Sequence, residues 1–143
     1  MRIDHVGVQL ADLESNLAWY EYVFNCQRSW DLTSFNSTTL SRLPGIQRLI
    51  EIKNQSLKLH LFQRDDLGMA SNTRAQFQHT AIEVNSKDDI EQIVDRVQQT
   101  KIAQCLESLS AIVTDSDQMT CCYFQDPEGN EYELVAYGTG LDN

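Results

Sequence analysis

The sequence predicts an α+β fold made of two βαβββ modules, and three observations lead to this prediction. Several stretches alternate apolar and polar residues with the period of a half-buried β-strand. Two other stretches repeat apolar residues with the period of an amphipathic helix. The same order of elements, a strand, a helix and three more strands, occurs twice along the 143 residues. We therefore expect a single domain, residues 1–143, that contains two similar modules.

The first module is expected over about residues 2–63. An alternating strand at residues 3–10 is followed by Asp12, which is a residue type that caps helix N-termini, and by a helix over about residues 13–24. The rest of this module is predicted as a weak strand over 27–35, a Ser/Thr/Asn-rich loop over 34–41, and strands over 46–52 and 57–62.

The second module is expected over about residues 77–137, after a polar, unpatterned linker at residues 64–76. Its first strand is predicted at residues 77–84, and Ser86 has the position of a helix cap. The remaining elements are predicted as a helix over 87–99, a strand near 102–106 and a closing hairpin over 119–137.

Composition and charge exclude several classes of protein. The chain has 41% hydrophobic and 22% charged residues, which is ordinary for a globular protein, and its formal net charge is −10. A protein that binds nucleic acids or anionic membranes needs a basic face, so the net charge argues against both kinds of partner. No apolar run has the length of a membrane span, which argues against a transmembrane helix. The four cysteines show no CxxC spacing, so we expect reduced thiols in a cytoplasmic protein: Cys26, Cys105, Cys121 and Cys122.

One carboxylate in the closing hairpin needs a partner. Glu133 lies in the middle of an alternating strand, between Tyr132 and Leu134. A carboxylate in such a position is costly to desolvate unless a positive group or a hydrogen-bond donor meets it. Glu133 is therefore a candidate functional residue.

The three histidines of the chain are the best candidates to meet this carboxylate. His5 and His79 lie on the first strand of each module, His60 and Glu133 on the last, and all four point away from the helix-covered face. A lone strand histidine is more often a hydrogen-bonded structural residue, but four side chains in matched register favour a metal site. Imidazole and carboxylate ligands suit Zn, Ni, Mn, Co or Fe(II). Lys58 is a second candidate, either for holding an anionic substrate or as a solvated lysine.

Several short stretches carry a resemblance to a known family. They are Asp4-His5-Val6-Gly7-Val8, Leu17-Ala18-Trp19-Tyr20, His79-Thr80-Ala81-Ile82, Asp126-Pro127-Glu128-Gly129-Asn130 and Glu133-Leu134-Val135. Together with the repeat, over about residues 2–137, they resemble the vicinal oxygen chelate superfamily of glyoxalase I, bleomycin-resistance proteins and extradiol dioxygenases. The resemblance implies a glyoxalase-like open-barrel cleft, with His5, His60, His79 and Glu133 as metal ligands.

The resemblance also implies a function. The expected protein is a divalent-metal-dependent enzyme of the lyase or isomerase type that chelates neighbouring oxygens of a small substrate and stabilises an enolate or oxyanion. Glu133 and His60 are then the catalytic residues. Glyoxalase I-like members carry a Glu, and epimerase-like members a Gln, at the position of His60, so Glu133 would act largely alone in proton transfer.

The same resemblance implies two alternative functions and a homodimeric assembly. The first alternative is an Fe(II) extradiol-type dioxygenase, with His5, His79 and Glu133 as ligands and His60 as an acid/base. The second is a drug-sequestering binding protein without enzymatic activity, whose known members typically lack the ligand set. The expected partners are a small-molecule substrate and a second copy of the chain in a homodimer.

Overall fold

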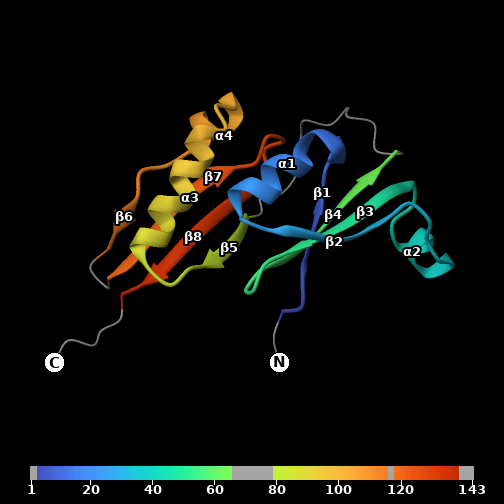
Figure 1. The fold of residues 1–143 in the computed structure, drawn as a ribbon, viewed down its shortest axis with the longest axis horizontal. Coiled ribbons are helices and arrows are strands. Elements are labelled where there is room, and N and C mark those ends of the chain that lie inside the picture. Colours follow the sequence, from blue (N-terminus) through green and yellow to red (C-terminus); the bar gives the residue numbers. More distant parts are fainter. Residues whose placement is uncertain (1–2, 66–78, 116–117, 139–143) are drawn as a thin grey trace. The chain divides into compact units, whose positions relative to one another are not determined.

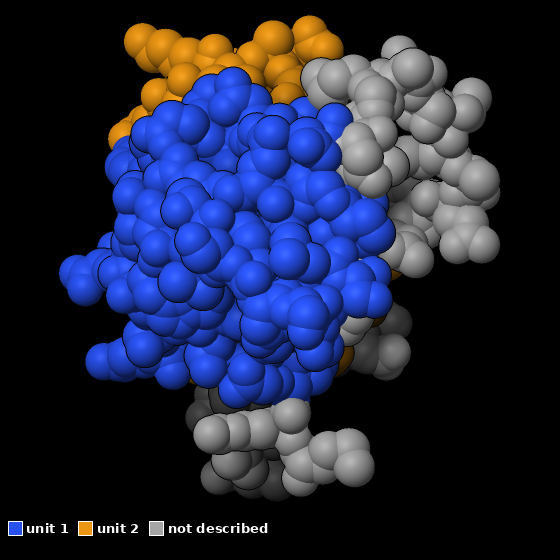
Figure 2. Space-filling view, turned by 90° about the vertical axis from the view of Figure 1, so that its right-hand side faces the viewer, with its two compact units in different colours: residues 1–74 blue, residues 75–143 orange. Residues whose placement is uncertain are grey.

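The computed structural model describes residues 3–65, 79–115 and 118–138. It confirms the α+β fold, with two four-stranded sheets that each carry helices. The chain divides into two compact units, residues 1–74 and 75–143, which have separate colours in Figure 2. Most of the predicted linker 64–76, with Phe77 and Gln78, lies outside the described residues. No helix in the described part of the chain is long and apolar enough to cross a membrane.

The sheet of unit 1 has the strand order β1-β4-β3-β2. β1 runs parallel to β4, and the other neighbours are antiparallel, so the first and last strands of the module lie side by side (Figure 1). The elements of this unit are β1 (Val6–Gln9), α1 (Leu13–Val23), β2 (Gln27–Leu32), α2 (Ser37–Arg42), β3 (Ile46–Lys53) and β4 (Lys58–Arg64).

The sheet of unit 2 repeats this topology in the order β5-β8-β7-β6. β5 is parallel to β8, while β7 pairs with β8 and β6 in antiparallel fashion. The elements of this unit are β5 (His79–Glu83), α3 (Lys87–Gln99), α4 (Ala103–Ser108), β6 (Val113–Thr114), β7 (Met119–Gln125) and β8 (Glu131–Tyr137).

The two long helices form for the reasons that the sequence suggests. The Asp12 side chain accepts a hydrogen bond from the backbone N–H of Ser15, and Ser86 accepts one from that of Asp89. The apolar stripe of each helix is buried, and we expect each such side chain to contribute about 1.5–3 kcal/mol. The stripes consist of Leu13, Leu17 and Tyr20 on α1 and of Ile90, Ile93, Val94 and Val97 on α3.

The helices α1, α3 and α4 each pack on one face of their own sheet. In unit 1 four strand residues on that face, Ile50, Ile52, Leu59 and Leu61, are fully buried, and α1 contacts β4. Arg48 of β3 also binds Glu14 of α1 and, at 2.7 Å, Asp31 of β2. In unit 2, α3 and α4 both contact β7. The opposite face of each sheet therefore carries the strand residues that point away from these helices.

Two sequence predictions about local structure are wrong. The stretch 34–41, predicted to be a loop, contains α2, because the Asn36 side chain accepts a hydrogen bond from the Thr39 backbone N–H and so caps a short helix. The strand predicted near 102–106 is the helix α4. The Ile102 carbonyl accepts hydrogen bonds from the backbone N–H groups of Cys105 and Leu106, and the helix buries Cys105. The edge strand of the sheet is instead β6.

Candidate metal centre

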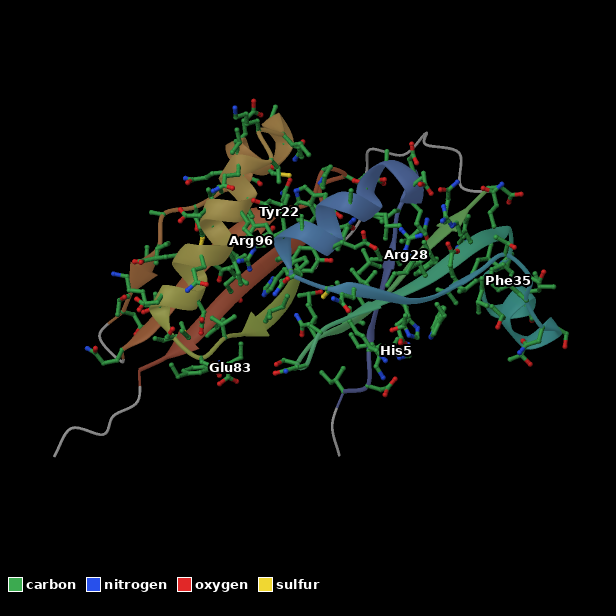
Figure 3. All side chains as sticks on the ribbon, viewed as in Figure 1. His5, Tyr22, Arg28, Phe35, Glu83 and Arg96 are labelled. Carbon is green, nitrogen blue, oxygen red and sulfur yellow. The ribbon has the colours of Figure 1, made fainter. Side chains whose placement is uncertain are left out.

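The structure brings His5 and His60 together in unit 1. Their rings are stacked, with centroids 3.7 Å apart and an interplanar angle of 17°. Gly7 is the register partner of His60 on β4, and His5 lies two residues before Gly7 on the same face of the chain. Figure 3 shows His5 on the side of the sheet away from α1.

A carboxylate fixes the orientation of His5. Nδ1 of His5 lies 2.9 Å from Oδ2 of Asp4, and Nζ of Lys58 lies 3.2 Å from Oδ1 of the same residue. Hydrogen bonds from His5 and Lys58 hold the pKa of Asp4 below its usual value, so the carboxylate is ionised near neutral pH. An ionised carboxylate only accepts hydrogen bonds, so Nδ1 of His5 donates this bond and Nε2 is the ring nitrogen left to bind a metal.

A second carboxylate, Glu51 of β3, meets His60. Nε2 of His60 lies 2.8 Å from Oε2 of Glu51, and the two residues are register partners. Burial by itself raises the pKa of Glu51, but hydrogen bonds from His60 and Ser29 bring that pKa below its ordinary value. The Trp30 and His60 rings make an edge-type contact, with centroids 4.9 Å apart. Because Nε2 of His60 faces Glu51, Nδ1 is its other ring nitrogen and the one left for a metal.

The structure also brings His79 and Glu133 together in unit 2. Nε2 of His79 lies 3.2 Å from Oε2 of Glu133, which is a separation that two ligands of one ion can have. The hydroxyl of Tyr123 donates a 2.8 Å hydrogen bond to Oε1 of Glu133. This hydrogen bond raises the pKa of Tyr123 to about 12, so the phenol stays protonated. Glu133 therefore has the donors that its mid-strand position requires.

The two pairs occupy equivalent positions in the repeat. Val6 pairs with Leu59, and Thr80 pairs with Tyr132. His5 and His79 directly precede the first members of these pairs, while His60 and Glu133 directly follow the second members. By the same register, Glu51 in unit 1 and Tyr123 in unit 2 are the neighbours of these last-strand residues on the third strand of each sheet.

Sequence reasoning missed Glu51 and Tyr123. Glu51 lies between the buried residues Ile50 and Ile52, so the argument that selects Glu133 applies to it equally. Tyr123 gave no comparable signal, because a tyrosine is an ordinary residue in a half-buried strand. Its role depends on the pairing of β7 with β8, which brings it opposite Glu133.

The donor set fits a divalent metal, but each unit supplies only part of a site. Among the residues that the structure describes, no three His, Cys, Asp or Glu side chains form a group that could hold an ion. Each pair offers two donors, with imidazole nitrogens in unit 1 and an imidazole and a carboxylate in unit 2. Burial raises the pKa of Cys121, and the charges of Glu133 and Asp115 raise it further, so this thiol is a poor ligand.

Comparisons with known proteins identify the family. The Glyoxalase/Bleomycin resistance protein/Dioxygenase superfamily matches residues 2–134, and the chain belongs to this superfamily. A metallothiol transferase FosB from Lysinibacillus sphaericus (strain C3-41) is 24% identical over 132 residues, which cover 92% of this chain and 79% of that protein.

Solved structures of the same superfamily share the fold at low sequence identity. A glyoxylase/bleomycin resistance protein/dioxygenase domain from Frankia sp. EAN1pec has a TM-score of 0.77 at 15% identity, and the match covers 99% of this chain and 95% of that one. The fosfomycin resistance protein FosX from Listeria monocytogenes, complexed with Mn(II) and sulfate, has a TM-score of 0.64 at 14% identity, with 96% and 93% covered. Lactoylglutathione lyase from Agrobacterium tumefaciens has a TM-score of 0.62 at 18% identity, with 94% and 92% covered.

Proposed function

We propose that this protein is a divalent-metal-dependent enzyme of the lyase or isomerase type, whose small substrate binds through two oxygens on neighbouring atoms. The observation that carries the proposal is the equivalent placement of His5 with His60 and of His79 with Glu133. A catalytic metal site takes three or more protein ligands, and each unit supplies one pair. We therefore propose that both pairs serve one ion. The metal in FosX and the enzymatic names of FosB and lactoylglutathione lyase support the proposal.

Each of the proposed residues has a defined task. His5, His79 and Glu133 hold the metal, with His60 as the fourth ligand, and the bound metal polarises the substrate oxygens as a Lewis acid. Asp4 keeps Nε2 of His5 directed to the site by binding Nδ1. Glu133 is a ligand that can leave the metal and accept, at Oε2, a proton from the carbon next to the substrate carbonyl, while Tyr123 binds Oε1. Glu51, beside His60, is a second carboxylate that can take part in proton transfer.

One observation favours a second candidate, an Fe(II) dioxygenase. Nε2 of His60 is hydrogen-bonded to Glu51, and such a histidine–carboxylate pair can act as an acid/base as well as orient a metal ligand. In this case His5, His79 and Glu133 act as a facial triad, and His60 with Glu51 acts as an acid/base pair. An oxygen-sensitive ferrous centre in the purified protein would support only this candidate.

The proposal extends to assembly and location. We propose a homodimer in which each site takes one pair of ligands from each chain. The cysteines Cys26, Cys105, Cys121 and Cys122 are all free thiols, which suits a reducing compartment such as the cytoplasm.

Metal analysis tests the proposed function. Protein purified without chelator should contain one divalent metal per pair of modules by mass spectrometry, and a Mn(II) titration followed by electron paramagnetic resonance should show the same stoichiometry. His79→Ala should abolish stoichiometric binding with little change in circular dichroism, whereas Glu83→Ala on the same strand should bind normally. Stoichiometric binding by His79→Ala would overturn the proposal. A panel of a 2-oxoaldehyde, a thioester and a catechol then separates the reaction types.

A further inference from the structure

The face of the first sheet that α1 leaves uncovered is organised in three rows of side chains. The rows follow from the register, since residues that pair across neighbouring strands point to the same face. The middle row crosses the sheet through Trp30, Glu51, His60 and Gly7. It contains the candidate ligand His60 and the carboxylate of Glu51, which binds His60. The chemistry of the rows on either side therefore determines which substituents of a substrate can bind beside the ligands.

The row on one side is apolar on β2, β3 and β4, and it ends at the polar Gln9 on β1. Leu32 pairs with Leu49, and Leu49 pairs with Phe62. Leu49 and Phe62 are half-buried, and Leu32 is 43% exposed, which leaves apolar surface open beside His60. This row lies directly beside the middle row, because Phe62 is two residues after His60 on the same strand and points to the same face.

The row on the other side is cationic, and both of its lysines are ion-paired. Lys53 pairs with Lys58 in register. Nζ of Lys53 lies 3.8 Å from Oε1 of Glu51, and Nζ of Lys58 lies 3.2 Å from Oδ1 of Asp4. An anionic substituent on a substrate would have to compete with these carboxylates for the lysines. On the described part of this face, an apolar substituent meets no such competition.

Gly7 keeps the approach from the middle row to Phe62 open. It lies opposite His60 across the β1–β4 pair, and a Cβ atom added at Gly7 would lie 3.6 Å from Cε1 of Phe62. That distance is an ordinary contact, so a side chain here would cover the ring edge without disrupting the fold. The absence of a side chain at Gly7 therefore leaves the Cε1 edge of Phe62 uncovered on this side.

We infer that the substrate carries an apolar substituent, which lies on Leu32, Leu49 and Phe62 while its paired oxygens reach the ligands of the middle row. The inference rests on the proposed function and names the substrate class for the same site. A substituent of the size of a phenyl ring, buried on these three side chains, should tighten binding at least about tenfold. A carboxylate substituent of similar length should give no such gain.

Three hydroxamic acids test this inference, because they chelate through the same two oxygens and differ only in the tail. Acetohydroxamate has no tail, 4-phenylbutyrohydroxamate has an apolar one, and glutaric monohydroxamate has an anionic one on the same three-carbon linker. Calorimetric titration of the Mn(II)-loaded protein should give the tightest binding for the phenyl compound. Leu32→Ala should remove most of its advantage and leave acetohydroxamate binding unchanged, and Gly7→Ala should also remove most of the advantage. Leu106→Ala, at an exposed leucine of α4, is the matched control and should change neither value.

A second readout does not depend on the metal. With methyl-labelled leucines, the phenyl protons of 4-phenylbutyrohydroxamate should give intermolecular nuclear Overhauser effects to Leu32 and Leu49 and none to Leu106, both in metal-free protein and in protein loaded with diamagnetic Zn(II). Equal affinities for the three tails, tighter binding of the anionic tail, or effects at other leucines would overturn the inference. Nuclear Overhauser effects between Leu49 of one chain and Leu49 of a differently labelled second chain would also overturn it. They would show that a second copy covers this face.

The two proposals fail in different ways. If the protein binds no stoichiometric Mn(II), the proposed function fails, and the contacts of the phenyl group in the metal-free protein still decide the inference. If Mn(II) and acetohydroxamate bind but the tail makes no difference, the inference fails and the proposed function stands.

Discussion

Glu51 accepts a 2.8 Å hydrogen bond from His60, and its side chain is only 9% exposed within the first sheet. A buried carboxylate with a depressed pKa is a charged acceptor, and such acceptors form the stronger class of hydrogen bonds. The pair therefore fixes the orientation of the His60 ring. It also supplies unit 1 with a carboxylate, so proton transfer need not fall to Glu133 alone.

The first prediction concerns Glu51→Gln. The amide keeps the shape of the side chain but removes the charge that holds His60, so metal affinity should fall about 10–100-fold if His60 is a ligand. Competition with a fluorescent chelator measures this affinity. Glu91→Gln on the exposed side of α3 is the matched control and should bind metal like the wild type. Unchanged affinity together with a large loss of activity would instead identify His60 and Glu51 as an acid/base pair.

The second prediction concerns Tyr123→Phe. The change removes the hydroxyl that binds Oε1 of Glu133 and keeps the ring that packs beside His79. The lost hydrogen bond to a charged group should lower the free energy of unfolding by about 1.5–3 kcal/mol at neutral pH, as measured by urea denaturation. Tyr137→Phe, at a tyrosine that is 57% exposed, should cost less than about 0.5 kcal/mol. Equal effects of the two changes would show that Tyr123 does not support Glu133.

The sequence predicts the large elements and the four candidate ligands, because both depend on periodicity. Helix caps at Asp12 and Ser86 and the alternation around His60 are local patterns, so they can be recognised without the fold. The α4 helix could not be recognised in this way. The short stretch from Ile102 to Leu106 has too few residues to show a clear period, and the burial of Cys105 that selects the helix depends on packing against β7.

The roles of Glu51 and Tyr123 also depend on the fold. Each is defined by the strand that lies beside it, β4 for Glu51 and β8 for Tyr123. The register of a sheet pairs residues that are separated along the chain, and the pattern within one strand contains no information about the neighbouring strand.

The third prediction concerns acid stability. Hydrogen bonds from Arg48 hold the pKa of Asp31 below its ordinary value of 3.8, so the folded protein binds this proton less tightly than the unfolded chain does. The stabilisation is therefore complete above that ordinary value and is lost as the pH falls through the lower, folded-state pKa. Asp31→Asn should destabilise the protein at pH 6 by up to about 1 kcal/mol, and by much less at the lowest pH at which the fold persists.

Urea denaturation over a pH series measures this difference. Asp95→Asn, at an exposed residue of α3, is the matched control and should follow the wild-type curve. A constant difference between Asp31→Asn and the wild type at every pH would contradict the assigned role of the Arg48 ion pair.

The fourth prediction concerns metal loading and pH. An imidazole must be neutral to bind a metal, so Mn(II) occupancy should fall as the pH drops through the histidine range near about 6.5 and below. The fall should be steeper than one proton per ion predicts, because more than one histidine must lose its proton. Electron paramagnetic resonance measures the free Mn(II), and the difference from the total Mn(II) gives the occupancy. Occupancy that stays flat from neutral pH to about pH 4 would contradict ligation by several histidines.

The last prediction concerns the assembly. If one ion takes His5 and His60 from one chain and His79 and Glu133 from another, a dimer has two shared sites. Neither His5→Ala nor Glu133→Ala homodimers should then bind metal at full strength. Mixing the two variants should restore binding, because in the heterodimer both changes fall in one site and the other site keeps all four wild-type ligands.

Subunit exchange must be verified before this result is read, for example by native mass spectrometry of differently labelled chains. The expected recovery is one intact site per heterodimer, or about one quarter of wild-type sites after statistical mixing, since half of the dimers are heterodimers and each has one of two sites intact. Mixing wild-type protein with Glu133→Ala is the control for exchange itself. No recovery after verified exchange would show that each site is contained within a single chain, because no combination of the two variants can then rebuild one.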